Sequence, residues 1–360
     1  MIIHSKIKDY QIHIEEDLSF LNRLEIDEKT QFVIDRKVYE LYTNYFAKID
    51  EKQLMLIDAT EENKVIDTAL IICEQMTNIS AKRNAVLISV GGGIIQDITG
   101  FVANILYRGI KWIFVPTTLL ASCDSCIGGK TSLNYKTYKN LLGTFYPPND
   151  IYICPCFFIT LTERDFKSGL GEVVKFNLMA GNEGLIRISE QIDALLNREY
   201  AAINDAVHYS LNYKKIFIEE DEFDKGERIK LNFAHTFGHA IEVVSNYQIP
   251  HGTAVAIGMI MADSISVCRG LLDPRYAAEA EQLLLKVIDI PTEMLVFDEA
   301  LFIDAISKDK KQIGKSLSAV LLIDGKDNKE LIMIHDMKAE EVCYAINHFR
   351  ACMTCSEGKV

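Results

Sequence analysis

Short apolar runs alternate with helical stretches over the first 160 residues of the chain. Between the runs, the segments EENKVIDTALIICEQM and IIQDITGFVANILY repeat apolar residues at intervals of three and four, as amphipathic helices do. The runs themselves are short, are closed by Gly, Pro, Asp or Thr, and predict buried strands at 31–35, 54–58, 86–93, 112–118 and 150–154. This alternation predicts an α/β domain with a Rossmann-like parallel sheet covered by helices.

Beyond Leu161 the pattern changes to long helical stretches, at 163–180, 185–219 and 232–247, with few strand candidates before 318–325. We therefore expect a mainly α-helical second domain. The predicted boundaries are 1–162 and 163–360, and no flexible linker, internal repeat or low-complexity segment separates them. Because ligands often bind where two domains meet, we expect the chemistry in a cleft between them.

Length, charge and composition narrow the classes of protein. A chain of 360 residues exceeds the size at which one hydrophobic core usually keeps growing, which favours two domains. The formal charge of −13 would repel a phosphate backbone, so we expect no nucleic-acid partner. Charges interrupt the apolar N-terminus, and no window approaches 18 apolar residues, so we expect neither a signal peptide nor a membrane span. These features predict a cytoplasmic protein.

The nine cysteines are an odd count, which favours reduced thiols over a complete disulfide framework. Three close pairs occur: Cys123 with Cys126, Cys154 with Cys156, and Cys352 with Cys355. The two C-x-x-C pairs lie too far apart for a zinc ribbon. We therefore interpret the pairs as structural or incidental thiols.

The segment SVGGGIIQDITG takes a strand through three glycines, Gly91, Gly92 and Gly93, into a helix. Glycines there let the backbone approach a pyrophosphate, whose charge is favoured at a helix N-terminus. A tight structural turn explains the pattern equally well. Asp35 closes one strand, and Glu61 with Lys64 opens a helical region; such residues fit either ribose hydroxyls or solvated charges.

A Gly- and Thr-rich segment follows the strand at 112–118 and holds Asp124, Lys130, Lys139 and Asn140. Its Gly-Gly-Lys turn has the ingredients of a phosphate cradle, namely backbone N–H groups and a point charge. The Walker A spacing G-x-x-x-x-G-K does not fit. We expect this segment to be a loop at the cleft.

His235 and His239 stand four residues apart and would share one helical face, and His251 follows a break at Pro250. Two neutral imidazoles plus one carboxylate would leave an open position on zinc, as a catalytic site requires. Glu172 lies on an apolar helix with Lys175 one turn later, which fits either such a site or a salt bridge.

A cationic stretch leads into this histidine segment, with Lys214, Arg228 and Asn232. Cations and an amide beside a neutral-histidine metal site suggest an anionic substrate. A solvated helix face is the alternative.

In this order, the segments resemble the 3-dehydroquinate synthase family of the sugar phosphate cyclases over roughly residues 30–320. The motifs that carry the resemblance are GGGIIQDITGFVA, YRGI, VPTTLLASCDSCIGGKT, KNLLGTFYPP, GLGEVVKF, LNFAHTFGHAIE and HGTAVAIGM. The resemblance implies a dehydroquinate synthase-like fold, with Zn²⁺ or Co²⁺ bound by Glu172, His235 and His251.

The resemblance also implies roles at the substrate. His239 would face the substrate phosphate with Lys130, Asn140 and either Lys310 or Lys311. Arg108 would reach the neighbouring site in a homodimer. The substrate's hydroxyls and carboxylate would be held by Asp124, Lys175, Lys214, Arg228 and Asn232.

For NAD, the resemblance implies a site along the glycine turn. Its residues would be Gly91, Gly92, Gly93 and Asp97, with Asp35, Glu61, Lys64, Thr117, Thr118, Asp124, Lys130 and Lys139 as further contacts. The implied lyase reaction converts 3-deoxy-D-arabino-heptulosonate 7-phosphate to 3-dehydroquinate and phosphate in the shikimate pathway of aromatic amino acid biosynthesis. It uses transient oxidation by NAD, phosphate elimination, reduction and an intramolecular aldol step.

Four positions depart from the family's usual residues. Ala234 and Ser132 stand where glycine is usual, and Thr253 and Asp224 stand where glutamate is usual or common. They leave open a paralogous cyclase acting on sedoheptulose 7-phosphate or on an aminated analogue.

Two further classes stay open. A metal-dependent polyol dehydrogenase would share the glycine turn but needs no phosphate pocket, so Lys130, Asn140, Lys175 and Arg228 argue against it. A non-catalytic NAD-binding module would not need the metal triad.

Overall fold

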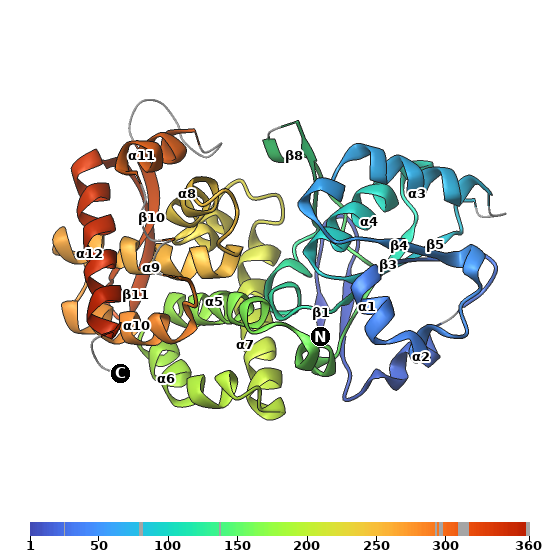
Figure 1. Ribbon diagram of the computed structural model, residues 1–360, viewed down its shortest axis with the longest axis horizontal. Coiled ribbons are helices and arrows are strands. Elements are labelled where there is room, and N and C mark those ends of the chain that lie inside the picture. Colours follow the sequence, from blue (N-terminus) through green and yellow to red (C-terminus); the bar gives the residue numbers. More distant parts are fainter. Residues whose placement is uncertain are drawn as a thin grey trace. The chain divides into compact units, whose positions relative to one another are not determined.

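The computed structural model describes residues 1–24, 26–78, 82–136, 138–291, 294, 298–308 and 317–357 (Figure 1). The chain divides into two compact units. Unit 1 comprises Met1–Leu161 with Lys215–Phe223, and unit 2 comprises Thr162–Lys214 with Asp224–Val360. The expected boundary between residues 162 and 163 gave each domain one continuous stretch. Helix α7 (Tyr200–Glu220) runs through the change of unit after Lys214 without a break, and Lys215–Phe223 is grouped with unit 1.

Unit 1 contains a seven-stranded sheet in the order β1-β2-β9-β6-β5-β3-β4. Its strands are β1 (Ile2–Ile3), β2 (Tyr10–Ile14), β3 (Thr30–Asp35), β4 (Leu54–Ile57), β5 (Val86–Gly91), β6 (Lys111–Pro116) and β9 (Asp150–Ile153). All neighbouring strands are parallel except β1 and β2. The predicted parallel sheet is therefore confirmed, with all five predicted strands present. The sequence did not indicate β1 and β2, because β1 has only two residues and the polar Gln11 and His13 interrupt the apolar run of β2.

Helices and an antiparallel hairpin complete unit 1 (Figure 1). The helices are α1 (Arg36–Leu41), α2 (Thr43–Phe46), α3 (Ile66–Asn78) and α4 (Gly93–Ile105), with short helical turns at Leu18–Arg23, Glu51–Gln53, Glu61–Asn63, Leu106–Arg108 and Pro155–Thr160. The segment expected as a loop instead forms a π-helical turn at Ala121–Ser125 and the hairpin β7 (Lys130–Tyr135) and β8 (Tyr138–Phe145). The hairpin packs against α4, so the polar side chains of both elements are held close together.

Unit 2 is mainly helical, as predicted. It contains α5 (Glu163–Met179), α6 (Asn182–Leu196), α7 to Lys214, α8 (His235–Val244), α9 (His251–Cys268), α10 (Pro274–Val287), α11 (Glu299–Ser307), α12 (Ala339–Glu357), the turn Glu227–Asn232 and the antiparallel pair β10 (Leu317–Asp324) and β11 (Lys329–Met337). The helix expected at 185–219 is divided in two. Arg198 has a positive φ of 57° at the division, a conformation incompatible with a continuous right-handed helix.

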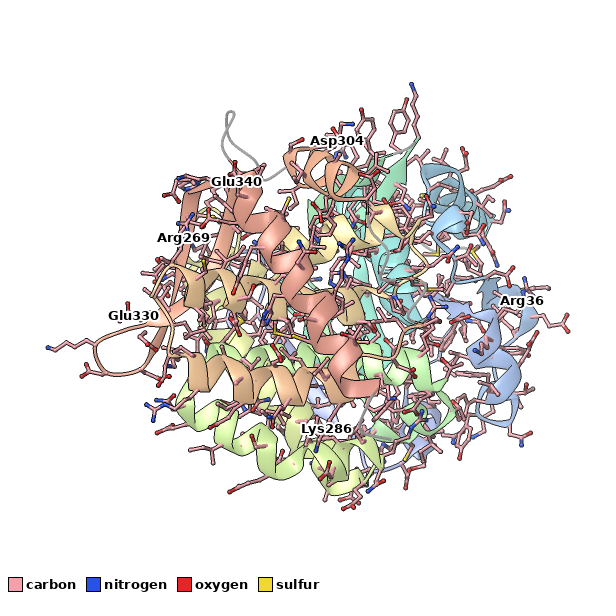
Figure 2. All side chains as sticks on the ribbon, turned by 60° about the vertical axis from the view of Figure 1, so that its left-hand side comes forward. Arg36, Arg269, Lys286, Asp304, Glu330 and Glu340 are labelled. Atoms are coloured by element: carbon pink, nitrogen blue, oxygen red, sulfur yellow. The ribbon has the colours of Figure 1, made fainter. Side chains whose placement is uncertain are left out.

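Helix α9 forms the core of unit 2, where it packs against α5, α8, α10 and α12. Within the described residues it has the length and composition of a membrane span, with a mean hydropathy of 1.3 over 18 residues. This corrects the expectation that no such window exists. Because 83% of the window is buried inside the structure, α9 is packed as a core helix and is weak evidence for a membrane span. Arg269, labelled in Figure 2, follows α9 and binds Glu341 of α12 at 2.6 Å.

Candidate active site

Two glycines bring the start of α9 against α5. A Cβ atom on Gly171 would lie 2.2 Å from the backbone oxygen of Gly252, and one on Gly252 would lie 1.8 Å from that of Ser168. Any larger residue would push the two helices apart. Their neighbours in sequence, Glu172 and His251, are therefore held at one point of unit 2.

Three candidate metal ligands meet there. The carboxylate Oε1 of Glu172 lies 3.7 Å from Nε2 of His235 and 3.6 Å from Nε2 of His251. These distances are too long for hydrogen bonds. Glu172 is fully buried, whereas both imidazoles retain some exposure. One carboxylate and two imidazole nitrogens around a common point form the donor set of an open Zn²⁺ or Co²⁺ site, so the residues fit the implied metal.

The second nitrogen of each histidine is held by a neighbouring group. His235 Nδ1 lies 3.0 Å from the backbone oxygen of Phe233, and His251 Nδ1 lies 3.1 Å from Oε2 of Glu242. With Nδ1–H donating to these acceptors, the neutral form of each imidazole has its lone pair on Nε2, the nitrogen nearer to Glu172, where a metal could bind it. Sequence reasoning gave Glu242 no role. Its position seven residues after His235, on the same face of α8, was the signal available.

One lysine and two carboxylates determine the charge around these candidate ligands. Lys175 is buried and its Nζ lies 2.5 Å from Oε2 of Glu172, one turn earlier on α5, as the spacing predicted. Burial opposes protonation of His251, but the carboxylates of Glu242 and Glu172 raise its pKa to about 10. The site thus favours a positive charge at His251 Nε2, where a bound cation would also lie.

His239 lies beside the candidate metal ligands. Its ring centroid is 5.5 Å from that of His235 and 6.0 Å from that of His251. His239 also lines a cavity in unit 2 with Lys308 and with Val243, Asn246 and Leu301. Lys310 and Lys311 lie outside the described residues.

The predicted cationic residues of unit 2 are buried. Arg228 and Asn232 lie in the turn Glu227–Asn232, and Lys175 Nζ donates to the backbone oxygen of Leu231 in this turn at 3.2 Å. Arg228 is only 3% exposed, so it is no solvated surface charge. Lys214 is buried on α7, which packs on α5 through Tyr213 and Phe176. The solvated-face alternative is therefore wrong for Lys214 and Arg228.

In unit 1 the glycine turn lies between β5 and α4. A Cβ atom on Gly91 would lie 2.7 Å from Ile95 Cγ1 and 3.3 Å from Asp35 Cβ, and one on Gly92 would lie 3.1 Å from Thr118. The turn is thus tightly packed and brings Asp35 and Thr118 to its sides. Burial raises the pKa of Asp35, which accepts a hydrogen bond from the backbone N–H of Lys37 at 3.1 Å.

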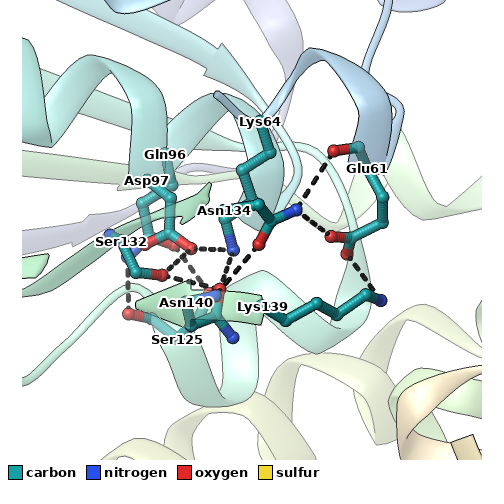
Figure 3. A network of polar contacts seen from close by, with 9 residues as sticks. All are labelled: Glu61, Lys64, Gln96, Asp97, Ser125, Ser132, Asn134, Lys139 and Asn140. Carbon is teal, nitrogen blue, oxygen red and sulfur yellow. Dashed lines mark hydrogen bonds and ion pairs between the residues drawn. The ribbon is translucent and has the colours of Figure 1, made fainter. Parts of the chain in front are cut away.

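A polar network beside this turn joins α4 to the hairpin (Figure 3). Lys64 Nζ lies 2.5 Å from Oδ2 of Asp97 and donates to Oδ1 of Asn140 at 2.7 Å. Ser132 donates to both oxygens of Asp97, through its backbone N–H at 3.1 Å and its hydroxyl at 3.0 Å. Burial raises the pKa of Asp97, while Lys64 and Ser132 oppose this shift.

The network continues to Glu61. Asn134 donates to Oε2 of Glu61 at 2.8 Å and accepts from the backbone N–H of Asn140 at 3.0 Å. Lys139 Nζ lies 3.4 Å from Oε1 of Glu61. The structure therefore brings together Glu61, Lys64, Asp97, Lys139 and Asn140, which the sequence had singled out separately. Sequence reasoning missed Asn134, and it noted Ser132 only as a departure.

The remaining residues of unit 1 occupy the surrounding segments. Thr117 is buried and its backbone N–H donates to the oxygen of Gly91 at 3.0 Å. Asp124 lies in the π-helical turn, and Lys130 is exposed at the start of β7. Arg108 is exposed after α4 with a positive φ of 64°.

Comparison with known proteins identifies the family. Residues 54–168 match the sequence model of the 3-dehydroquinate synthase N-terminal domain, and residues 169–312 match that of the C-terminal domain. This chain belongs to the 3-dehydroquinate synthase family. The 3-dehydroquinate synthase of Clostridium tetani is 36% identical over 348 residues, covering 94% of this chain and 89% of its own. That of Campylobacter concisus is 36% identical over 352 residues, covering 97% and 98%.

Solved structures agree on the fold. A 2-deoxy-scyllo-inosose synthase complexed with carbaglucose-6-phosphate, NAD⁺ and Co²⁺ has a TM-score of 0.83 at 24% identity, covering 96% of this chain and 98% of its own. The predicted fold class and the resemblance to 3-dehydroquinate synthases are therefore confirmed. At this identity the similarity concerns the fold.

Proposed function

We propose that this protein is a 3-dehydroquinate synthase that converts 3-deoxy-D-arabino-heptulosonate 7-phosphate to 3-dehydroquinate and phosphate, with NAD and Zn²⁺ or Co²⁺. Family membership over nearly the whole chain supports the reaction. The observation that carries the proposal is the convergence of Glu172, His235 and His251 next to the buried Lys175. A non-catalytic NAD-binding module would not need this donor set.

In this proposal Glu172, His235 and His251 hold the metal, which when bound would polarise adjacent hydroxyls of the substrate. Glu242 orients His251 and increases its basicity. Lys175 compensates the charge of Glu172 and offers its remaining N–H groups to a substrate oxygen.

NAD would lie along Gly91, Gly92 and Gly93, and when bound it would supply the transient oxidation. The close approach of Asp35 to Gly91 supports Asp35 as the ribose-binding acid of this site. The further NAD contacts in this proposal are Glu61, Lys64, Asp97, Thr117, Thr118, Asp124, Lys130 and Lys139.

Two sets of residues would bind the anionic ends of the substrate. Lys214, Arg228 and Asn232 would hold the carboxylate, and the burial of Arg228 supports this role because a guanidinium shielded from water attracts a carboxylate more strongly than an exposed one does. Asp124 would bind substrate hydroxyls. The phosphate would contact Lys130, Asn140, His239 and one of Lys310 and Lys311.

We further propose that residues 1–162 form the NAD-binding domain and residues 163–360 the metal- and substrate-binding domain of a cytoplasmic homodimer. Arg108 would contact the neighbouring subunit's site. Its exposure at the end of α4 is compatible with this role.

The decisive test is turnover of 3-deoxy-D-arabino-heptulosonate 7-phosphate by metal-loaded protein with NAD. We expect equal amounts of phosphate and 3-dehydroquinate, identified by mass and ultraviolet absorbance, without accumulation of NADH. His251→Ala serves as the inactive control. Absence of turnover by protein that still binds NAD and zinc would contradict the proposal, and sedoheptulose 7-phosphate and the aminated analogue would then identify a paralogous cyclase.

A further inference from the structure

A second cluster of metal-ligand side chains lies in unit 2, formed by Glu281 on α10 and by His348 and Cys352 on α12. Nε2 of His348 lies 2.8 Å from Oε2 of Glu281 and 3.5 Å from Sγ of Cys352. All three ligand atoms lie within 4.8 Å of one another. None of these residues belongs to the candidate active site described above.

The geometry suits a tetrahedral transition-metal ion. Bonds of about 2.0–2.3 Å to nitrogen, oxygen and sulfur place the ligand atoms of a tetrahedral zinc site about 3.3–3.6 Å apart. The separation of His348 and Cys352 already has this value. The carboxylate of Glu281 would move away from His348 by about half an ångström, a change within the rotamer freedom of a glutamate.

Helical spacing and burial explain why these ligands are presented together. His348 and Cys352 are four residues apart on α12, so they share one face of the helix. Cys352 is only 9% exposed, whereas the side chains of Glu281 and His348 are 24% and 36% exposed. The sulfur is thus shielded from solvent while an ion can still reach the site.

The charges of the cluster favour a cation. Glu281 supplies a carboxylate, which is ordinarily ionised at neutral pH. A divalent cation that displaced the thiol proton would then meet one carboxylate, one imidazole and one thiolate, all ligands preferred by zinc.

We propose that Glu281, His348 and Cys352 form a second, structural site for Zn²⁺ or a similar divalent transition metal, with a water molecule as fourth ligand. The ion would clip α10 to α12, and both helices pack against α9, whose first residue is His251. The sequence alone had suggested that Cys352 is an incidental thiol. The proposal is independent of the substrate and of the proposed reaction.

Cobalt separates this site from the active site, because only a thiolate ligand gives a sulfur-to-cobalt charge-transfer band in the near ultraviolet. Glu172, His235 and His251 contain no sulfur. We expect the metal-free protein to bind two equivalents of Co²⁺ and to show this band. We expect His251→Ala, which removes a ligand of the active-site cluster, to bind one equivalent with the band intact.

Variants of the cluster assign the band. We expect Cys352→Ser to bind one equivalent without the band and to retain activity, and Cys268→Ser, which removes an exposed thiol of the same unit, to behave as wild type. His348→Gln, which keeps a hydrogen-bond donor for Glu281, tests the site if Cys352→Ser fails to fold.

In the His251→Ala background, Zn²⁺ should raise the Tm, and adding Cys352→Ser should abolish that shift. A wild-type protein that binds one equivalent without the band, or a band unchanged in Cys352→Ser, would overturn the proposal and leave an ion pair beside a thiol.

Discussion

The two units hold polar clusters of opposite character. In unit 1 the network around Asp97 is closed by contacts of 2.5–3.1 Å between Lys64, Ser132, Asn140 and their neighbours. In unit 2 the nitrogens of His235 and His251 stand 3.6–3.7 Å from Glu172, beyond hydrogen-bonding distance. The first cluster is a scaffold that needs no ligand to hold its shape. The second is arranged around a point that a cation would fill.

The sharpest test of this difference is Glu172→Gln. We expect loss of the active-site metal and a fall in activity beyond about 10³-fold, because a neutral amide is a poor ligand and the charge acting on the substrate is lost. The buried ammonium of Lys175 would lose its counter-ion, which should lower the free energy of unfolding by about 3–5 kcal/mol. Metal analysis, activity and denaturant unfolding measure the three effects.

The double variant Glu172→Gln/Lys175→Met is the matched control. It should recover much of the stability but neither the metal nor the activity. A single variant that kept its active-site metal would disprove the ligand assignment.

For the network in unit 1, Lys64→Met should lower the free energy of unfolding by about 1–3 kcal/mol, since it leaves the largely buried carboxylate of Asp97 without its cation. The active-site metal should stay bound. Urea unfolding and metal content together check this expectation. A loss below about 1 kcal/mol would mean that Ser132 alone can hold Asp97 in place.

Asp263 on α9 extends the comparison to a buried carboxyl group that has no hydrogen-bond partner among the described residues. Burial raises its pKa to about 8, with Lys329 opposing the shift. Because the folded state keeps this proton and the unfolded state releases it near pH 4, the contribution of Asp263 to the free energy of unfolding should be fully present below pH 4 and be lost, by a few kcal/mol, as the pH rises to about 8. Asp263→Asn should remove this part of the pH dependence. Equal pH slopes of the Tm for both proteins would contradict the shift.

A variant of Glu242 tests how far metal binding depends on a residue that orients a candidate ligand, His251. Glu242→Gln should weaken metal affinity by about 10–100-fold, because His251 loses a charged acceptor at Nδ1. The metal-free protein should also lose some stability, because the charge of Glu242 helps to raise the pKa of His251 in the folded state. Glu227→Gln, at an exposed pair with Lys230, is the control and should bind metal as wild type does. Competition with a chromophoric chelator measures both affinities.

Sequence reasoning succeeded where local pattern determines structure and fell short where the tertiary fold does. The strands of the parallel sheet, the helical face shared by Glu172 and Lys175, and the glycine turn follow from periodicity and residue type. The role of Ser132 in holding Asp97 requires the hairpin, whose polar residues resemble a loop. The contact of Glu242 with His251 and that of Glu281 with α12 depend on how the helices pack, and this packing cannot be inferred from the pattern of a single sequence.

Ala234 carries the smallest expected effect and bears on the family assignment. It stands where the family usually has glycine, and its φ of 67° lies in the left-handed region, which costs a non-glycine residue about 1–2 kcal/mol. Ala234→Gly would remove that cost. It would also lose a buried methyl group, worth about 0.8 kcal/mol, and add about 0.5–1 kcal/mol of unfolded-state entropy. The net change in the free energy of unfolding should therefore stay within about 1 kcal/mol, and metal affinity should not change, because His235 keeps its bond to Phe233. Ala234→Val, whose branched side chain tolerates this φ poorly, should be clearly less stable. If Ala234→Gly instead altered metal affinity tenfold, the alanine would be shown to change the geometry of the metal site. The replacement of the family's usual glycine by alanine would then favour a specialised cyclase.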